Sequence, residues 1–154
     1  AFVILNQNLV FSDYSVEELI DQLRCIANDE ELKALKRGDI SRREAALSAF
    51  WKSKDPTPGT PENELMDEYY RRVKFAECTF KITGGHGWQS PQGQVYISFG
   101  PPDDVRRIEN IFPDPPYEVW EYRQHKRRFV FAEVGKDSYQ LLDPISFNGF
   151  RIRR

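Results

Sequence analysis

The sequence contains few of the side chains that build metal centres and disulfide networks. Two cysteines and two histidines occur among its 154 residues. None of them stands in a CxxC, HxxxH or HxH arrangement, and a metal site needs three or four clustered ligands. We therefore predict no metal site and no cofactor. Cys25 and Cys78 fall on predicted helices, where buried free thiols are common, and a single disulfide between them is the alternative.

Long apolar runs are also missing, and so is an excess of basic charge. The longest apolar run covers only residues 1–5, whereas a helix needs roughly 20 apolar residues to span a bilayer. The formal net charge is -2, which gives no global basic field for nucleic acid. Basic residues gather in residues 125–128 and 151–154, and such runs usually form solvated surfaces. We therefore predict no transmembrane segment and no nucleic-acid partner.

Helical signals fill the first half of the chain. Ser15 is an N-cap candidate whose capping box is completed three residues later, and Asn28 or Asp29 starts a short second helix. Ser41 has the same capping-box spacing and predicts the start of a third helix. Apolar residues follow each start at helical spacing.

A break and a fourth helix follow. Two prolines and a glycine in residues 54–59 end the third helix. Thr60 and Pro61 then fit the N-cap and first residue of a new helix. Its predicted buried stripe consists of Leu65, Tyr69, Val73, Ala76 and Phe80. The glycine-rich residues 84–87 end this half, and they predict a chain reversal with positive φ angles rather than a phosphate loop, because they follow a helix.

The second half has the alternating pattern of β-strands. Four strands are predicted, at residues 95–99, 117–122, 129–134 and 139–142. The turns between the last three are short, which favours antiparallel neighbours. The predicted fold class is therefore α+β: N-terminal helices followed by a four-stranded antiparallel sheet packed on the helices.

Three parts of the chain differ in character. Residues 1–14 form an apolar N-terminal arm or the remnant of a preceding domain, residues 15–143 form the main domain, and residues 144–154 form a C-terminal tail. The arm opens directly on Phe2–Leu5, which leads us to expect a neighbouring folded unit. We expect the arm to pair with the edge of the domain's own sheet or with a second copy, giving a possible homo-oligomer.

Several phrases in order resemble the bacterial GWxTD-domain family, over residues 16–142. They are Phe50-Trp51, residues 55–64, residues 69–73, Gly87-Trp88, residues 93–97, residues 100–103, residues 120–122 and residues 129–131. Ser90 and Pro91 stand where the family name implies Thr and Asp, and Gln92 stands where Arg is often seen. The resemblance implies a fold but names no function. It also implies an extracytoplasmic location and an extra β-rich domain before this one.

Two hypotheses for function come from different classes. A non-catalytic binding or structural module of unknown ligand is the first, with an unknown protein or a preceding domain as partner. The alternative is a hydrolase-like enzyme that uses His86, Ser90 and Asp103 as base, nucleophile and orienting group. Their spacing does not require such a site. Ser90 beside Pro91 also fits a turn, and Asp103 also fits a cap on a helical turn through residues 105–108.

The loop at residues 57–64 is predicted to be ordered, because proline fixes φ and acidic residues suit a helix N-terminus. We expect it to lie close to the Gly87-Trp88 turn and to Asp103. The candidate binding-surface residues are Thr60, Glu62, Glu64, Arg71, Trp88 and Asp103. The three tryptophans, at positions 51, 88 and 120, are predicted to pack in the core rather than in a ligand pocket.

Overall fold

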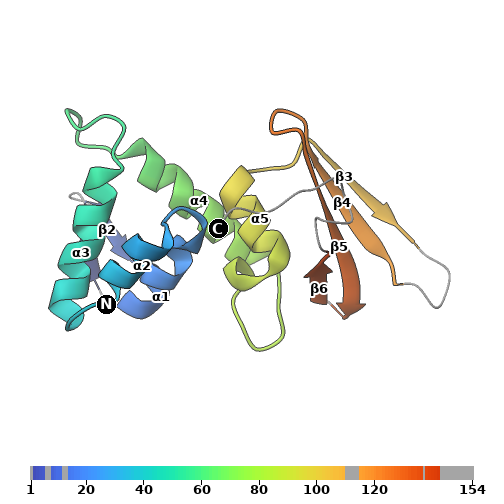
Figure 1. The fold of residues 1–154 in the computed structure, drawn as a ribbon, viewed down its shortest axis with the longest axis horizontal. Coiled ribbons are helices and arrows are strands. Elements are labelled where there is room, and N and C mark those ends of the chain that lie inside the picture. The colour runs from blue at the N-terminus through green and yellow to red at the C-terminus, as the bar shows by residue number, and fades with distance from the viewer. Residues whose placement is uncertain (1, 6–7, 12–13, 110–114, 137, 143–154) are drawn as a thin grey trace. The chain divides into compact units, whose positions relative to one another are not determined.

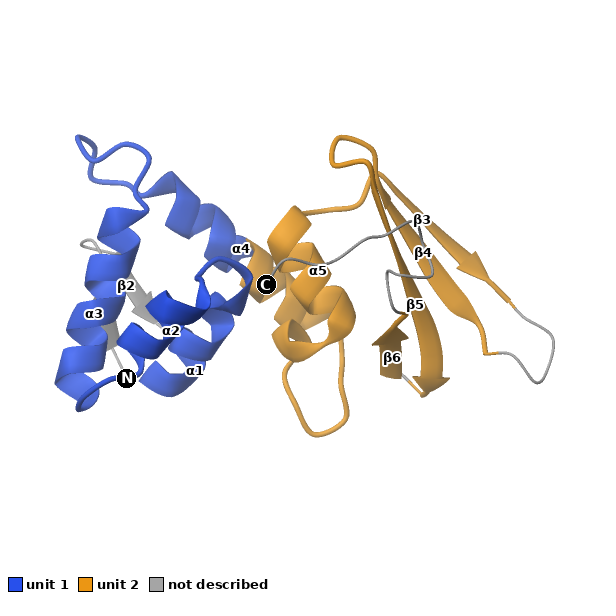
Figure 2. Ribbon diagram, in the orientation of Figure 1, with its two compact units in different colours: residues 1–71 blue, residues 72–154 orange. Residues whose placement is uncertain are grey.

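The computed structural model describes residues 2–5, 8–11, 14–109, 115–136 and 138–142 (Figure 1). It divides into two units, residues 1–71 and 72–154 (Figure 2). The elements of the first unit are β1 (Phe2–Leu5), β2 (Asn8–Phe11), α1 (Val16–Gln22), a 3-10 helix (Leu23–Cys25), α2 (Asp29–Leu35) and α3 (Ile40–Ser53). The unit boundary falls within α4 (Glu64–Thr79). The second unit then contains a 3-10 helix (Gly87–Gln89), α5 (Pro91–Phe99), β3 (Asp104–Ile108), β4 (Tyr117–Tyr122), β5 (Arg127–Gly135) and β6 (Ser138–Leu141).

The first three helices begin at polar caps. The predicted capping box at Ser15 is present, and Asn28 caps α2 with a capping box of its own, since each side chain accepts the backbone N–H three residues on. The predicted start of α3 at Ser41 is wrong. Asp39 caps this helix, and its carboxylate accepts the Arg42 N–H at 2.9 Å, so Ser41 already lies inside the first turn.

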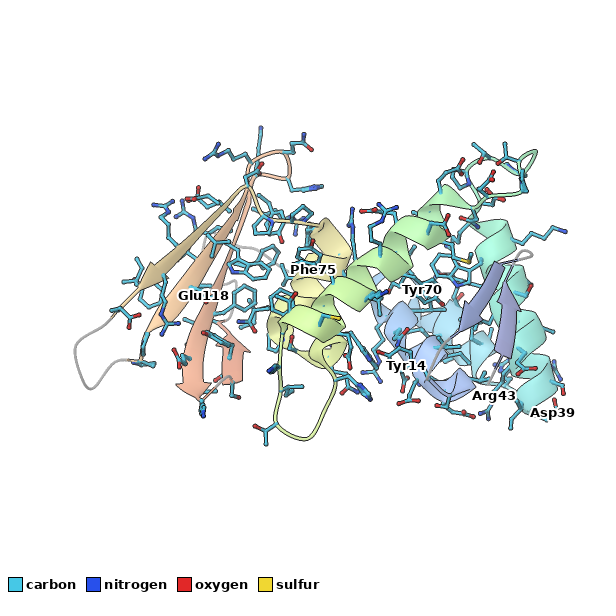
Figure 3. All side chains as sticks on the ribbon, turned by 180° about the vertical axis from the view of Figure 1, so that it is seen from behind. Tyr14, Asp39, Arg43, Tyr70, Phe75 and Glu118 are labelled. Atoms are coloured by element: carbon cyan, nitrogen blue, oxygen red, sulfur yellow. The ribbon has the colours of Figure 1, made fainter. Side chains whose placement is uncertain are left out.

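The core of the first unit surrounds Trp51. This side chain is buried together with Leu47 and Phe50, as the helical spacing predicts. The Trp51 indole N–H donates to the Tyr70 hydroxyl at 3.2 Å (Figure 3). The neighbouring Tyr69 hydroxyl donates to the Gln22 backbone carbonyl. These two bonds satisfy polar groups that burial would otherwise leave unpaired.

Helix α4 begins three residues later than Thr60-Pro61 suggests. Asn63 is buried, and its side-chain oxygen accepts the Met66 N–H at 2.9 Å while its side-chain nitrogen donates to the Trp51 carbonyl at 2.8 Å. The buried face of α4 also differs from the predicted one. Met66 is buried, whereas Leu65 is 38% exposed.

Two predicted elements of the second unit have the wrong type. Residues 95–99 belong to helix α5 rather than to a strand, because Ser90 caps the helix and Pro91 fits its first position. Residues 104–108 form strand β3 rather than a helical turn, since Asp104 pairs with Glu121 and the strand runs antiparallel to β4. The other three predicted strands are confirmed.

The sheet has the order β3-β4-β5-β6, and every neighbouring pair is antiparallel (Figure 1). Side chains alternate between its two faces. The inner face forms the core of the second unit around Val95 of α5, and its buried aromatic residues are Trp120, Tyr122, Phe129 and Phe131. Helix α5 lies against β6. Helices followed by a four-stranded antiparallel sheet confirm the α+β class.

The N-terminal arm pairs with itself. Strands β1 and β2 form an antiparallel hairpin in which Phe2 lies opposite Phe11, and β1 lies against α3. It does not extend the four-stranded sheet, contrary to one of the two expectations. An oligomer through this arm stays a prediction.

Three further features of the described residues are the state of the two cysteines, the absence of a membrane-spanning helix and the absence of a metal site. Cys25 and Cys78 are both thiols and are not joined in a disulfide. Over residues 2–142, with the gaps given above, no helix is long and apolar enough to cross a bilayer. Within the same residues, no group of three or more His, Cys, Asp or Glu side chains is arranged to hold a metal ion.

Candidate functional site

The Gly87–Ser90 turn packs very closely on the second half of α4. A Cβ atom at Gly87 would lie 2.2 Å from the Phe80 carbonyl oxygen and 2.3 Å from that of Ala76. A Cβ at Gly93 would lie 2.2 Å from the Gly87 carbonyl oxygen. No side chain fits at either position without moving backbone, so both glycines are required by packing.

Ser90 connects this turn to α5. It is buried, its hydroxyl donates to the Gly87 carbonyl at 2.7 Å, and its oxygen accepts the Gly93 N–H at 2.9 Å. The hydroxyl proton is therefore used within the turn, and the oxygen caps the helix. Pro91 at the first helical position lacks an N–H that the helix would leave unpaired in any case.

His86 and Trp88 add aromatic and polar groups to the turn. The His86 ring stacks on Trp88 with 5.9 Å between ring centroids, and its Nδ1 lies 2.9 Å from Glu77 Oε1. Trp88 is buried. Among the described residues, Trp88 Nε1 and Glu77 Oε2 are buried without a hydrogen-bond partner. A buried donor or acceptor without a partner costs about 1–3 kcal/mol of folding free energy. One such atom lies in the turn and the other on α4 beside it.

The outer face of the sheet carries a second candidate site. Cross-strand pairing places Ile108, Tyr117 and Ala132 in one row, and Arg106, Val119 and Val130 in the next. This face contains a shallow hollow with a volume of about 440 Å³. The lining residues are Arg106, Ile108, Tyr117, Val119, Arg128, Val130 and Leu142. They include two arginines and no carboxylate.

A basic hollow adjoins the apolar one at the β4–β5 turn. It measures about 310 Å³ and is lined by Glu121, Tyr122, Arg123, Lys126, Arg127 and Arg128. Arg128 lines both hollows. Its guanidinium lies 2.7 Å from Glu121, and Arg106 also pairs with that carboxylate. The outer face therefore joins an apolar floor to a basic turn.

A family model describing the GWxTD domain matches residues 3–148. The chain belongs to the GWxTD-domain family. No curated protein matches the chain, and no solved structure does.

The residues that follow Gly87-Trp88 start α5. Ser90 caps this helix through its hydroxyl, and a threonine hydroxyl caps a helix in the same way. Pro91 is the first helical residue, a position that suits proline.

The three side chains of the hydrolase hypothesis each have a structural partner in this GWxTD domain. Ser90 bonds within its own turn, and His86 pairs with Glu77. The Asp103 carboxylate accepts the Arg123 N–H at 2.6 Å, which ties it to the β4–β5 turn rather than to a helical turn. The hydrolase site stays an untested alternative.

The predicted binding surface divides between the two units. Thr60, Glu62 and Glu64 belong to the first unit, where the loop is held by internal hydrogen bonds such as Thr57 Oγ1 to Glu64 Oε2 at 2.5 Å. This hydrogen bond lowers the pKa of the Glu64 carboxyl. The surface residue Arg71 pairs with Glu68 at 2.6 Å.

The remaining members of the predicted surface, Trp88 and Asp103, belong to the second unit. Their expected closeness to the loop at residues 57–64 stays a prediction. The predicted burial of all three tryptophans is confirmed.

Sequence reasoning missed the outer face of the sheet. The strand at residues 117–122 is predicted correctly, and its alternation already assigns Tyr117 and Val119 to the face opposite Trp120. The prediction of a helical turn through residues 105–108 hid the neighbouring strand. The same alternation, continued into β3, would have placed Arg106 and Ile108 beside Val119.

Proposed function

We propose that this GWxTD domain is a non-catalytic protein-binding module, and that its contact surface is the outer face of the β3–β6 sheet. The observation that carries the proposal is the hollow of about 440 Å³ with a mainly apolar lining. Ile108 and Leu142 in this lining are 38% and 37% exposed. Contiguous apolar surface that stays in contact with water is typical of interaction sites.

The occupant that fits best is a segment of another protein that carries apolar side chains next to carboxylates. Apolar groups would fill the floor, and carboxylates would face Arg106 and Arg128 at the rim. Residues 143–154 of the chain itself follow Leu142, but they lie outside the described residues. They carry three arginines and one aspartate, so like charge makes them a poorer match for this rim.

The chemistry of the motif supports a non-catalytic function. A nucleophilic serine needs a base that accepts its proton. In this domain the Ser90 hydroxyl donates its proton to the Gly87 carbonyl inside a buried turn. Together with the binding function we propose a bacterial, extracytoplasmic setting, which rests on the family resemblance.

A peptide-selection experiment tests the binding surface. Peptides selected from a random twelve-residue display library against the full chain should bind wild type saturably. Ile108→Asp and Leu142→Asp should each weaken binding at least about tenfold, because a buried carboxylate opposes apolar contacts. Val105→Asp is the matched control, since Val105 lies on the same strand as Ile108, is 50% exposed and faces the other side of the sheet. Circular dichroism verifies that all three variants fold.

Three results would contradict the proposal. The first is equal binding by the Ile108→Asp variant and the wild type. The second is peptide binding that appears only after residues 143–154 are deleted, because the chain's own tail would then be the occupant. The third is hydrolysis of 4-nitrophenyl acetate by the wild type that is lost in His86→Ala and Ser90→Ala, which would favour the hydrolase.

A further inference from the structure

We propose that the β4–β5 turn, here taken with the first two residues of β5 as residues 123–128, is a carboxylate-binding site that recognises the acidic part of the partner segment. The inference deepens the proposed binding function, because Arg128 lines both the apolar hollow and the basic one. Five of the six residues in this turn have basic side chains: Arg123, His125, Lys126, Arg127 and Arg128. The basic run that the sequence presents as a solvated surface thus lies beside the apolar site.

The backbone of the turn is held in place by hydrogen bonds, and one of its guanidinium groups packs on an aromatic ring. The Lys126 N–H donates to the Arg123 carbonyl at 3.0 Å, and Lys126 adopts a positive φ of 51°. The Arg123 N–H donates to the Asp103 carboxylate at 2.6 Å, which anchors the turn to the segment before β3. The Arg127 guanidinium lies over the Phe99 ring, 5.6 Å from its centroid. A turn fixed in this way loses little conformational entropy when it binds.

The charge balance of the hollow favours an anion. Its lining contains four Arg or Lys side chains and one carboxylate, that of Glu121. Glu121 already shares its charge between Arg106 and Arg128. Guanidinium groups bind carboxylates through paired, charge-assisted hydrogen bonds, and this geometry selects carboxylates over neutral groups.

An acidic peptide fits this turn better than nucleic acid or an anionic membrane. Tyr122 and Phe129 at the base of the turn are each 2% exposed, so neither ring offers a face on which a base can stack. The exposed side chains between them are polar, so the turn lacks the apolar anchor with which proteins insert into a membrane interface. The net charge of -2 also opposes a long polyanion.

Fluorescence anisotropy with labelled octaglutamate tests the site in the full chain. Wild type should bind this probe saturably, and raising salt from about 20 to about 200 mM should weaken binding, because salt screens exposed charges. The double variant Arg123→Glu/Lys126→Glu should lose at least about tenfold in affinity, since charge-assisted hydrogen bonds are replaced by repulsion. The control Lys33→Glu/Lys136→Glu changes the net charge equally and should lose less than about twofold.

Several outcomes would overturn the inference. They are the absence of saturable octaglutamate binding, an equal loss in the two double variants, or tighter binding of an eight-residue thymidine oligonucleotide or of phosphatidylserine vesicles. The proposed function fails separately, if Ile108→Asp leaves the binding of the selected peptides unchanged. Selected peptides that bind wild type and lose affinity in Ile108→Asp, alongside octaglutamate that does not bind, would defeat only the inference about the basic turn.

Discussion

At the scale of single residues, the family motif is explained by packing and capping. Gly87 gives space for two carbonyl oxygens, and Ser90 satisfies the first turn of α5. The identity of these residues was available from the sequence, but their role was not. A serine before a proline fits a turn as well as a helix start, and only the buried contact with α4 distinguishes the two.

Substitution of Ser90 tests the capping role. Ser90→Ala should destabilise the chain by about 1–3 kcal/mol, because it removes the cap and leaves the buried Gly93 N–H without its partner. Ser90→Thr should keep most of the stability, since its hydroxyl can make the same bonds. Ser98→Ala is the control, because the Ser98 hydroxyl bonds to the Gln94 carbonyl on the exposed side of the same helix. Thermal unfolding measures all three, and equal losses for the two alanine variants would rule out the special role of Ser90.

The raised pKa of Tyr70 predicts that the free energy of unfolding falls at alkaline pH. Burial raises the pKa of Tyr70 to about 12, above its ordinary value of 10.0. A folded-state pKa above the unfolded value contributes stability that is complete below pH 10 and is lost as the pH rises towards about 12. Urea denaturation at pH 8 and pH 11 should therefore show a smaller decline for Tyr70→Phe than for wild type. Parallel declines in the two proteins would show that Tyr70 does not cause this pH dependence.

At the scale of elements, the sequence predicts starts of helices better than it predicts which of two nearby caps is used. The Ser/Thr-Pro pattern occurs three times, at Thr57-Pro58, Thr60-Pro61 and Ser90-Pro91. Ser90-Pro91 starts α5, whereas Thr60-Pro61 lies in a loop and Asn63 precedes α4. Asn63 prevails because it bonds both to its own helix and to the carbonyl of Trp51, a contact distant in sequence.

Comparison of Asn63→Ala with Thr60→Ala tests this choice of cap. Asn63→Ala should cost about 1–3 kcal/mol, because it removes the buried partner of the Met66 N–H and one of the two hydrogen bonds that the Trp51 carbonyl accepts. Thr60→Ala should change stability by less than about 1 kcal/mol, since its hydroxyl is exposed. Chemical denaturation supplies both values. Should Thr60→Ala prove the more damaging, α4 would begin where the Thr-Pro pattern indicates.

The strand predicted at residues 95–99 shows where periodicity misleads. Val95 and Ile97 are both buried, and Tyr96 between them stacks on Phe75 (Figure 3). A short helix packed on more than one side has no continuous polar face, so its pattern no longer shows the helical period. Strand β4, by contrast, is buried only at Trp120 and Tyr122, which lie on one face, and its alternating pattern is retained.

At the scale of the whole molecule, the fold class and three of the four strands follow from the sequence, because helices and strands are segregated along the chain. The candidate site follows only in part. The basic run at residues 125–128 was visible, but its neighbour, the apolar hollow, depends on the pairing of β3 with β4 across a sequence gap. The alternation within each strand is visible in the sequence, but which strands pair, and in which register, is set by tertiary structure.

The position of Arg128 has a consequence for energetic coupling. One guanidinium lines the apolar hollow and the basic hollow, and it also pairs with Glu121. An anion that draws the Arg128 guanidinium towards the β4–β5 turn changes the edge of the apolar hollow. An apolar group that packs on the methylene groups of Arg128 changes where its charge lies at the turn. The free energies of occupying the two hollows are therefore not additive. A partner that fills both should bind with an affinity that neither half predicts, and a double-mutant cycle through Arg128 would measure the difference.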